Sequence, residues 1–90
     1  MKRVHMYISG RVQGVFYRSH TKEKADQLSL GGWVRNLNDG RVEAVFEGTP
    51  ESVDQIISWC EKGPPSSEVT HVDIQEEPHT GDFSRFSIRY

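Results

Sequence analysis

The feature that most constrains the fold is a helical stripe of apolar residues in the segment 50–62. Four of them recur at the i, i+3, i+4 and i+7 spacing of one helical face: Val53, Ile56, Ile57 and Cys60. Thr49 suits the N-cap, and Pro50 suits the first helical position, where no amide hydrogen is required. Gly63 and the two prolines after it end the helix. The segment therefore predicts an amphipathic helix with one buried face.

A second helical pattern begins at Tyr17. Its positions Tyr17, Thr21, Ala25 and Leu28 fall on one helical face, and charged residues fill most of the positions between them. We expect the Gly31-Gly32 pair to end this helix, because glycine readily takes the left-handed conformation found after helix C-termini. The sequence thus predicts two helices.

Alternating polar and apolar residues predict β-strands around the two helices. The expected strands are 4–9, 33–37, 41–47, a segment around 72–74, and 86–90. The Asn-Asp-Gly segment 38–40 predicts a hairpin, since that turn needs residues that tolerate positive φ. In the third strand apolar residues alternate with charged ones, including Glu43 and Glu47, so we expect one buried side and one solvent-facing side.

The order of these elements predicts the fold class. It is β-α-β-β-α-β with an extra strand at the C-terminus, which indicates an α+β ferredoxin-like sandwich. We expect a mostly antiparallel sheet of four to five strands with both helices on one face. The 90 residues are enough for one domain, 1–90. This topology supports many unrelated activities, so the function has to come from the site.

Composition narrows the function classes. The chain has 11 Lys and Arg against 13 Asp and Glu, a net charge of −2, which lacks the basic excess typical of nucleic-acid binders. The four histidines show no metal-ligand spacing, so we expect neither a metal nor a cofactor. The start shows no signal-peptide pattern and no stretch suits a membrane span. A cytoplasmic monomer is the simplest expectation.

The single cysteine and one histidine are candidate reactive groups with simpler explanations. Cys60 cannot form an internal disulfide, and its place on the apolar helical stripe favours a core residue over a nucleophile. His20 follows closely after the first strand-to-helix loop and could lie near the site, but a solvated helix residue is the favoured interpretation. The acidic pair Glu76-Glu77 is interpreted as solvated charge.

The loop between the first strand and the first helix is the main candidate site. Gly10 and Gly14 bracket it, and backbone amides in such a turn can curl into a concave anion-binding nest at the helix N-terminus. Arg18, in the first helical turn, can offer two parallel hydrogen bonds to the same anion. From these residues alone, an ordinary turn with a solvated arginine remains equally open.

Asn36 is the second candidate, because asparagine is disfavoured inside a strand. Strict alternation places it on the same face as Val34, opposite Trp33 and Arg35. Its amide can both donate and accept, and so can hold a water for attack. Spacing alone favours an exposed or hairpin-adjacent asparagine that bonds to a neighbouring backbone group.

Together these residues resemble a known family. Residues 10–18 (GRVQGVFYR) and 32–36 (GWVRN) are similar to the two-part signature of acylphosphatases, and the resemblance extends to the closing residues 86–90. It implies hydrolysis of an acyl phosphate to carboxylate and inorganic phosphate, with Arg18 clamping the phosphate and Asn36 orienting water. Phosphate or sulfate would be a ligand. The amides implied to cradle the phosphate belong to Arg11, Val12, Gln13, Gly14, Val15 and Phe16.

Position 16 departs from many microbial members of that family, which carry glycine there. Phe16 is bulkier, and we expect it to affect packing or access of the acyl group more than binding of the phosphate.

Two other functions stay open. A non-catalytic anion-binding module is the closer one, since acylphosphatase-like domains also begin larger hydrogenase-maturation proteins. An RNA-binding domain would need exposed aromatic residues on the central strands, where this chain has acidic ones.

Overall fold

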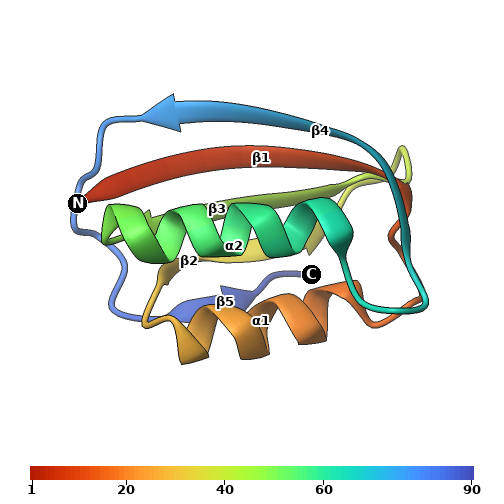
Figure 1. The fold of residues 1–90 in the computed structure, drawn as a ribbon, viewed down its shortest axis with the longest axis horizontal. Helices are drawn as coiled ribbons and strands as arrows, with labels where there is room; N and C mark the ends of the chain where they lie inside the picture. The colour runs from red at the N-terminus through yellow and green to blue at the C-terminus, as the bar shows by residue number, and fades with distance from the viewer.

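The predicted helices and strands are all present in the computed structural model, which describes residues 1–90. Figure 1 shows the elements, which follow in chain order: β1 (Lys2–Arg11), α1 (Tyr17–Gln27), β2 (Gly31–Asn36), β3 (Val42–Gly48), α2 (Pro50–Lys62), β4 (Glu68–Glu77) and β5 (Phe86–Ile88). Thr49 caps α2 as expected, because its side chain accepts a hydrogen bond from the amide of Ser52. Neither helix is both long and apolar enough to cross a membrane.

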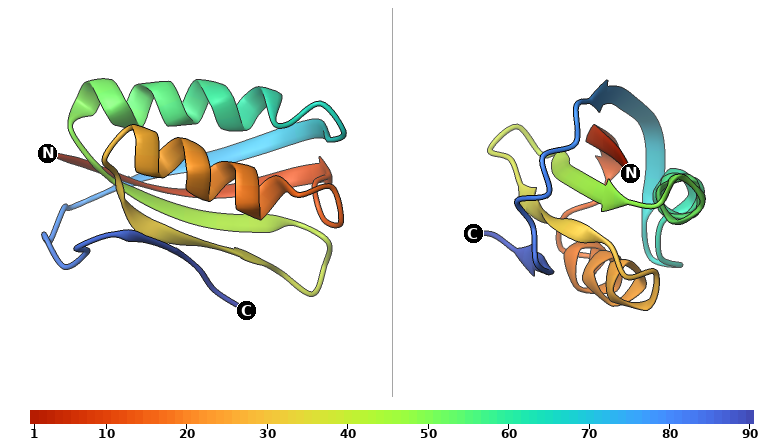
Figure 2. Two further views of the ribbon diagram at one scale, coloured as in Figure 1. Left: turned by 90° about the horizontal axis from the view of Figure 1, so that it is seen from below. Right: turned by 90° about the vertical axis from the view of Figure 1, so that its left-hand side faces the viewer.

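The strands form one sheet in the order β4-β1-β3-β2-β5. Neighbouring strands run antiparallel, except that β5 pairs parallel with β2. Figure 2 shows both helices on one face of this sheet, with the other face left uncovered. The ferredoxin-like prediction is therefore confirmed, and the extra C-terminal strand extends the sheet at its β2 edge.

The core lies between the helices and the covered face of the sheet. Alternate residues of β1, namely Val4, Met6 and Ile8, are buried there, together with the apolar stripes of both helices. The rings of Phe46 and Phe86 stack with centroids 5.3 Å apart, which ties the short β5 to the core.

The two glycines expected to end α1 belong to β2 instead. The helix ends at Gln27, and the chain turns through Ser29, whose φ is 58°, before β2 begins at Gly31. Position 32 requires glycine for β2 to pack closely against β3. Its φ is 130°, and a side-chain carbon there would lie 1.9 Å from the carbonyl oxygen of Val45. The glycine pair thus permits close backbone approach within the sheet.

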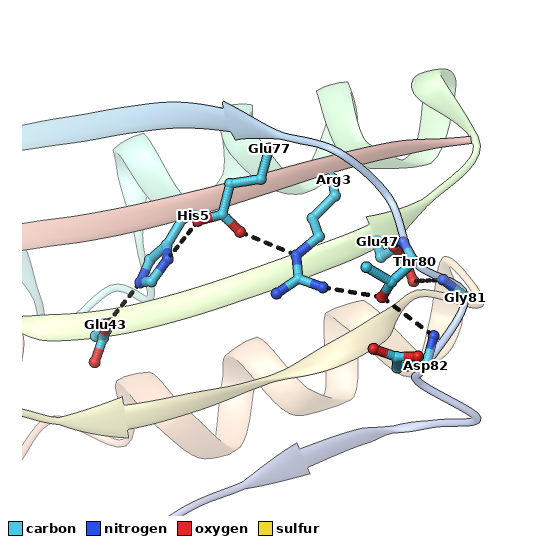
Figure 3. A network of polar contacts seen from close by, with 8 residues as sticks. All are labelled: Arg3, His5, Glu43, Glu47, Glu77, Thr80, Gly81 and Asp82. Atoms are coloured by element: carbon cyan, nitrogen blue, oxygen red, sulfur yellow. Dashed lines mark hydrogen bonds and ion pairs between the residues drawn. The ribbon is translucent and has the colours of Figure 1, made fainter.

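The expectation that β3 has one solvent-facing side is wrong. All residues of β3 are buried, including Glu43 and Glu47, because β3 is the central strand and its outer side is covered by side chains of its neighbours. Glu47 accepts hydrogen bonds from the amides of Thr80 and Gly81, at 2.8 and 3.2 Å. This carboxylate therefore holds the loop before β5 against the sheet (Figure 3).

A polar network crosses the uncovered face of the sheet. His5 lies between two carboxylates, with Nε2 2.6 Å from Glu43 and Nδ1 3.1 Å from Glu77 (Figure 3). Arg35 also donates to Glu43, and Arg3 to Glu77. Burial acts to raise the pKa of both carboxyls, but these hydrogen bonds outweigh it and lower the pKa of each. Glu77, interpreted above as a solvated charge, is therefore paired.

This pairing predicts loss of stability in acid. Because both carboxyls have a lower pKa folded than unfolded, their contribution is complete above the unfolded value of 4.5 and is lost as the pH falls through the folded values. Thermal unfolding measured from about pH 6 to pH 3 should show a falling Tm, by about 4–8 °C for each kcal/mol lost. Glu77→Gln should flatten this slope, whereas Asp54→Asn, at an exposed carboxylate, should not. Equal slopes in all three proteins would contradict the assignment.

Candidate active site

The loop between β1 and α1 presents free backbone amides. None of the amides of residues 12–16 donates a hydrogen bond to the protein. The first turn of α1 adds amides that have no intrahelical acceptor, at the positive end of the helix dipole. A run of free N–H groups at a helix N-terminus is a site for an anion.

Two residues give the loop its curled shape. Gly14 has φ 72° and Phe16 has φ 63°, so both adopt the left-handed conformation, with Val15 between them. Left-handed residues within such a turn direct successive N–H groups toward a common centre. Gly14 lies in open space, which keeps the approach to its amide clear.

The loop forms one wall of an open hollow of about 280 Å³. The structure brings Arg18 and Asn36 to this same hollow, although they come from a helix and a strand. The remaining lining residues come from the loop, the start of α1 and the C-terminal end: Val12, Gly14, Phe16, Tyr17, Ser19, Ile88 and Tyr90. The hollow therefore lies between the β1–α1 loop and the end of β2, and residues of the C-terminal segment, Ile88 and Tyr90, border it as well.

Arg18 is half-buried and forms no ion pair with an acidic side chain. Its guanidinium carbon lies 5.0 Å from the centre of the Tyr90 ring, which packs against the flat cation. Arg18 is also the one cationic residue that lines the hollow. Its hydrogen-bond donors are therefore available to an anion held at the loop.

Asn36 is the last residue of β2 and pairs with Val42 of β3. Its side-chain oxygen Oδ1 is buried and has no hydrogen-bond partner. Buried polar atoms are almost always satisfied, so an unpaired one at a hollow indicates a place for water or a ligand. That this amide orients a water for attack stays a prediction.

Gln13 has a role that the sequence did not reveal. Its amide nitrogen donates to the carbonyl oxygens of Leu37 and Arg41, at 2.7 and 2.9 Å. These carbonyls belong to the β2–β3 hairpin, which begins directly after Asn36. Gln13 therefore ties the anion loop to the strand end that carries Asn36. The other predicted loop residues differ, since Arg11 is exposed and Val15 packs against the core.

Two residues considered as reactive groups lie elsewhere. His20 is exposed and lines a separate groove with Trp59 and Pro64. Cys60 is fully buried, and burial raises the pKa of its thiol to about 12, so the thiolate form needed for nucleophilic attack is not available near neutrality. The structure contains no group of three or more His, Cys, Asp or Glu side chains that could hold a metal ion.

The fold and the free amides beside the hollow define a small α+β protein with a candidate anion-binding loop. Comparisons with known proteins give its family. The family model described as acylphosphatase matches residues 4–88. An acylphosphatase of Rubrobacter xylanophilus is 54% identical over 88 residues, which are 98% of this chain and 80% of that protein. The crystal structure of acylphosphatase from Bacillus subtilis superposes with a TM-score of 0.96 at 37% identity, over the full length of both chains.

A partial relative is much longer. HypF from T. kodakarensis matches all of this chain with a TM-score of 0.85 and 31% identity, but the match covers 12% of that protein.

The chain belongs to the acylphosphatase family. It is an enzyme that hydrolyses the carboxyl–phosphate bond of acyl phosphates to carboxylate and inorganic phosphate.

Proposed function

We propose that the phosphoryl group of the substrate binds in the hollow between the β1–α1 loop and Asn36. The amides of residues 11–16 and the guanidinium of Arg18 bind its oxygens, and Asn36 holds the attacking water. The observation that carries this proposal is that Asn36, whose buried Oδ1 has no hydrogen-bond partner, lines the same hollow as Arg18. In this proposal Oδ1 accepts a hydrogen bond from the water, which orients a lone pair of the water toward phosphorus.

The arrangement suits the demands of phosphoryl transfer. The transition state is loose, and negative charge spreads over the three equatorial oxygens of the phosphoryl group. Fixed amides and a guanidinium stabilise that charge without reorganising during the reaction. A carboxylate is a good leaving group, so the departing oxygen needs little acid catalysis. Positioning and electrostatics therefore supply most of the rate enhancement.

The proton of the attacking water has no evident acceptor on the protein. No His, Asp, Glu, Lys or Cys lines the hollow. Tyr17 lines it, but burial raises the pKa of its hydroxyl well above the usual range, and the hydroxyl donates to the carbonyl oxygen of Cys60. We therefore assign the proton to an oxygen of the substrate's own phosphate.

This assignment predicts that the rate does not change with the protonation of any protein side chain near neutral pH. When release of inorganic phosphate from benzoyl phosphate is measured, kcat/KM should show no change caused by a protein group between about pH 6 and 8. An unperturbed histidine would titrate in that range. His20→Gln is the matched control and should leave the profile unchanged, since this side chain lines a different groove. A step that disappears in His20→Gln would contradict the assignment.

The cellular setting follows from the same features. We propose that the protein acts as a monomer in the cytoplasm on a small acyl phosphate, with residues 1–90 as one domain. One free, buried cysteine suits a reducing compartment. All catalytic groups proposed above come from one chain, so the site needs no second copy. Phosphate or sulfate, which share the tetrahedral oxygens of the phosphoryl group, should compete with substrate.

A further inference from the structure

Phe16 contributes little to the folded core. Its side chain is 73% exposed, and it is not among the hydrophobic residues that pack against the core. Its φ of 63° is unfavourable for a bulky residue. It also occupies the N-cap of α1, where its side chain makes no capping hydrogen bond. An aromatic residue at this position therefore needs an explanation outside folding.

The position of Phe16 offers one, because it lies at the phosphate hollow. Phe16 lines this hollow together with four further residues that have apolar or aromatic side chains: Val12, Tyr17, Ile88 and Tyr90. Tyr90 is 98% exposed, so two exposed rings border the same space. Apolar and aromatic lining around a few polar groups is typical of a ligand site. The amides and Arg18 account for the phosphoryl group, which leaves the apolar lining for the rest of the substrate.

We infer that Phe16 is a specificity-determining residue that contacts the acyl group and favours aromatic acyl phosphates over small aliphatic ones. This inference rests on the proposed function, since the acyl group reaches Phe16 only when the phosphoryl group occupies the loop. An aromatic acyl group can pack against the exposed ring, whereas an acetyl group offers one methyl. Aromatic pairs of this kind change binding by about two- to tenfold.

The test compares two substrates in four proteins. We would measure kcat/KM for benzoyl phosphate and acetyl phosphate in the wild type, Phe16→Gly, Phe16→Ala and Phe16→Tyr. The ratio of the two values cancels any effect common to both substrates, such as a shift of the loop amides. We expect the benzoyl-to-acetyl ratio to fall about two- to tenfold in Phe16→Gly and Phe16→Ala, and to stay within about twofold of the wild type in Phe16→Tyr.

The glycine and alanine variants separate the ring from the backbone. Both remove the ring, but only glycine relieves the left-handed strain. A fall in the ratio in both variants, with Phe16→Tyr unchanged, supports the inference. A fall in Phe16→Gly alone would trace the effect to loop conformation and overturn it. An unchanged ratio in both variants would also overturn it. Phe16→Gly should unfold at the wild-type temperature or above, since the ring has no place in the core.

Failure of this inference is distinguishable from failure of the proposed function. If the wild type hydrolyses both substrates and Arg18→Gln is inactive, but the ratio stays unchanged in the glycine and alanine variants, only the role of Phe16 is rejected. If Arg18→Gln and Asn36→Ala keep the wild-type rate on both substrates, the proposed site itself is rejected, and the role of Phe16 falls with it.

Discussion

Arg18→Gln should lower kcat/KM for benzoyl phosphate by about a thousandfold or more. Arg18 is the one cation that lines the hollow, and it forms no ion pair within the protein. An arginine that stabilises a transferring phosphoryl group is worth roughly 10³–10⁵ in rate. Glutamine keeps a polar side chain but loses the charge and the forked donor geometry. Inhibition by inorganic phosphate should weaken as well, because in the proposed site the same guanidinium also binds the ground-state anion.

Two further variants separate the charge of Arg18 from the bidentate hydrogen-bonding geometry of its guanidinium. Arg85→Gln removes an exposed arginine that lies outside the hollow and should keep wild-type activity. Arg18→Lys keeps the charge without the bidentate geometry and should remain far below the wild type. Circular dichroism and thermal unfolding would confirm that each variant is folded. Near-normal turnover by a folded Arg18→Gln protein would refute the proposed phosphate site.

Asn36→Ala should separate chemistry from binding. We expect kcat to fall by about 10²–10³, the typical effect of losing one oriented hydrogen-bonding group at a reaction centre. The inhibition constant of inorganic phosphate should change little, because the attacking water and not the anion loses its partner. Steady-state kinetics with benzoyl phosphate, together with phosphate inhibition, would measure both quantities.

The same variant should not be less stable than the wild type. Oδ1 of Asn36 is buried without a partner, and removing an unsatisfied polar atom relieves a desolvation penalty. Asn38→Ala, at an exposed hairpin position, is the matched control for both activity and Tm. A large loss of Tm in Asn36→Ala would indicate a structural role, and retention of the full rate would contradict the assignment of the water.

Much of the fold could be predicted because it depends on local patterns. The apolar stripe of α2 and its cap at Thr49 are both found as expected. The alternation of β1 correctly separates its buried residues from those on the other face. The alternation around Val34 likewise places Asn36 toward the side of the sheet that the helices cover. Such periodicities are imposed by backbone geometry, so they survive in any packing arrangement.

Contacts between distant segments were not predictable in the same way. Glu43 is buried because residues from neighbouring strands surround it, and its sequence neighbours carry no sign of this. The pairing of His5 with Glu77 joins residues 72 positions apart. Tyr90 reaches Arg18 only because β5 runs parallel beside β2. Each of these contacts depends on the strand order, which becomes visible only in the folded protein.

That strand order has a consequence for the route by which the chain folds. β1 lies inside the sheet, yet both of its partners, β3 and β4, are made later in the sequence. Arg3 at its start bonds to Glu77, 74 residues away. Entropy must be lost in closing such large loops before the contacts can compensate, which slows the search for the native state. We therefore expect the strand order that brings a loop, a strand end and the C-terminal residues around one hollow to slow folding.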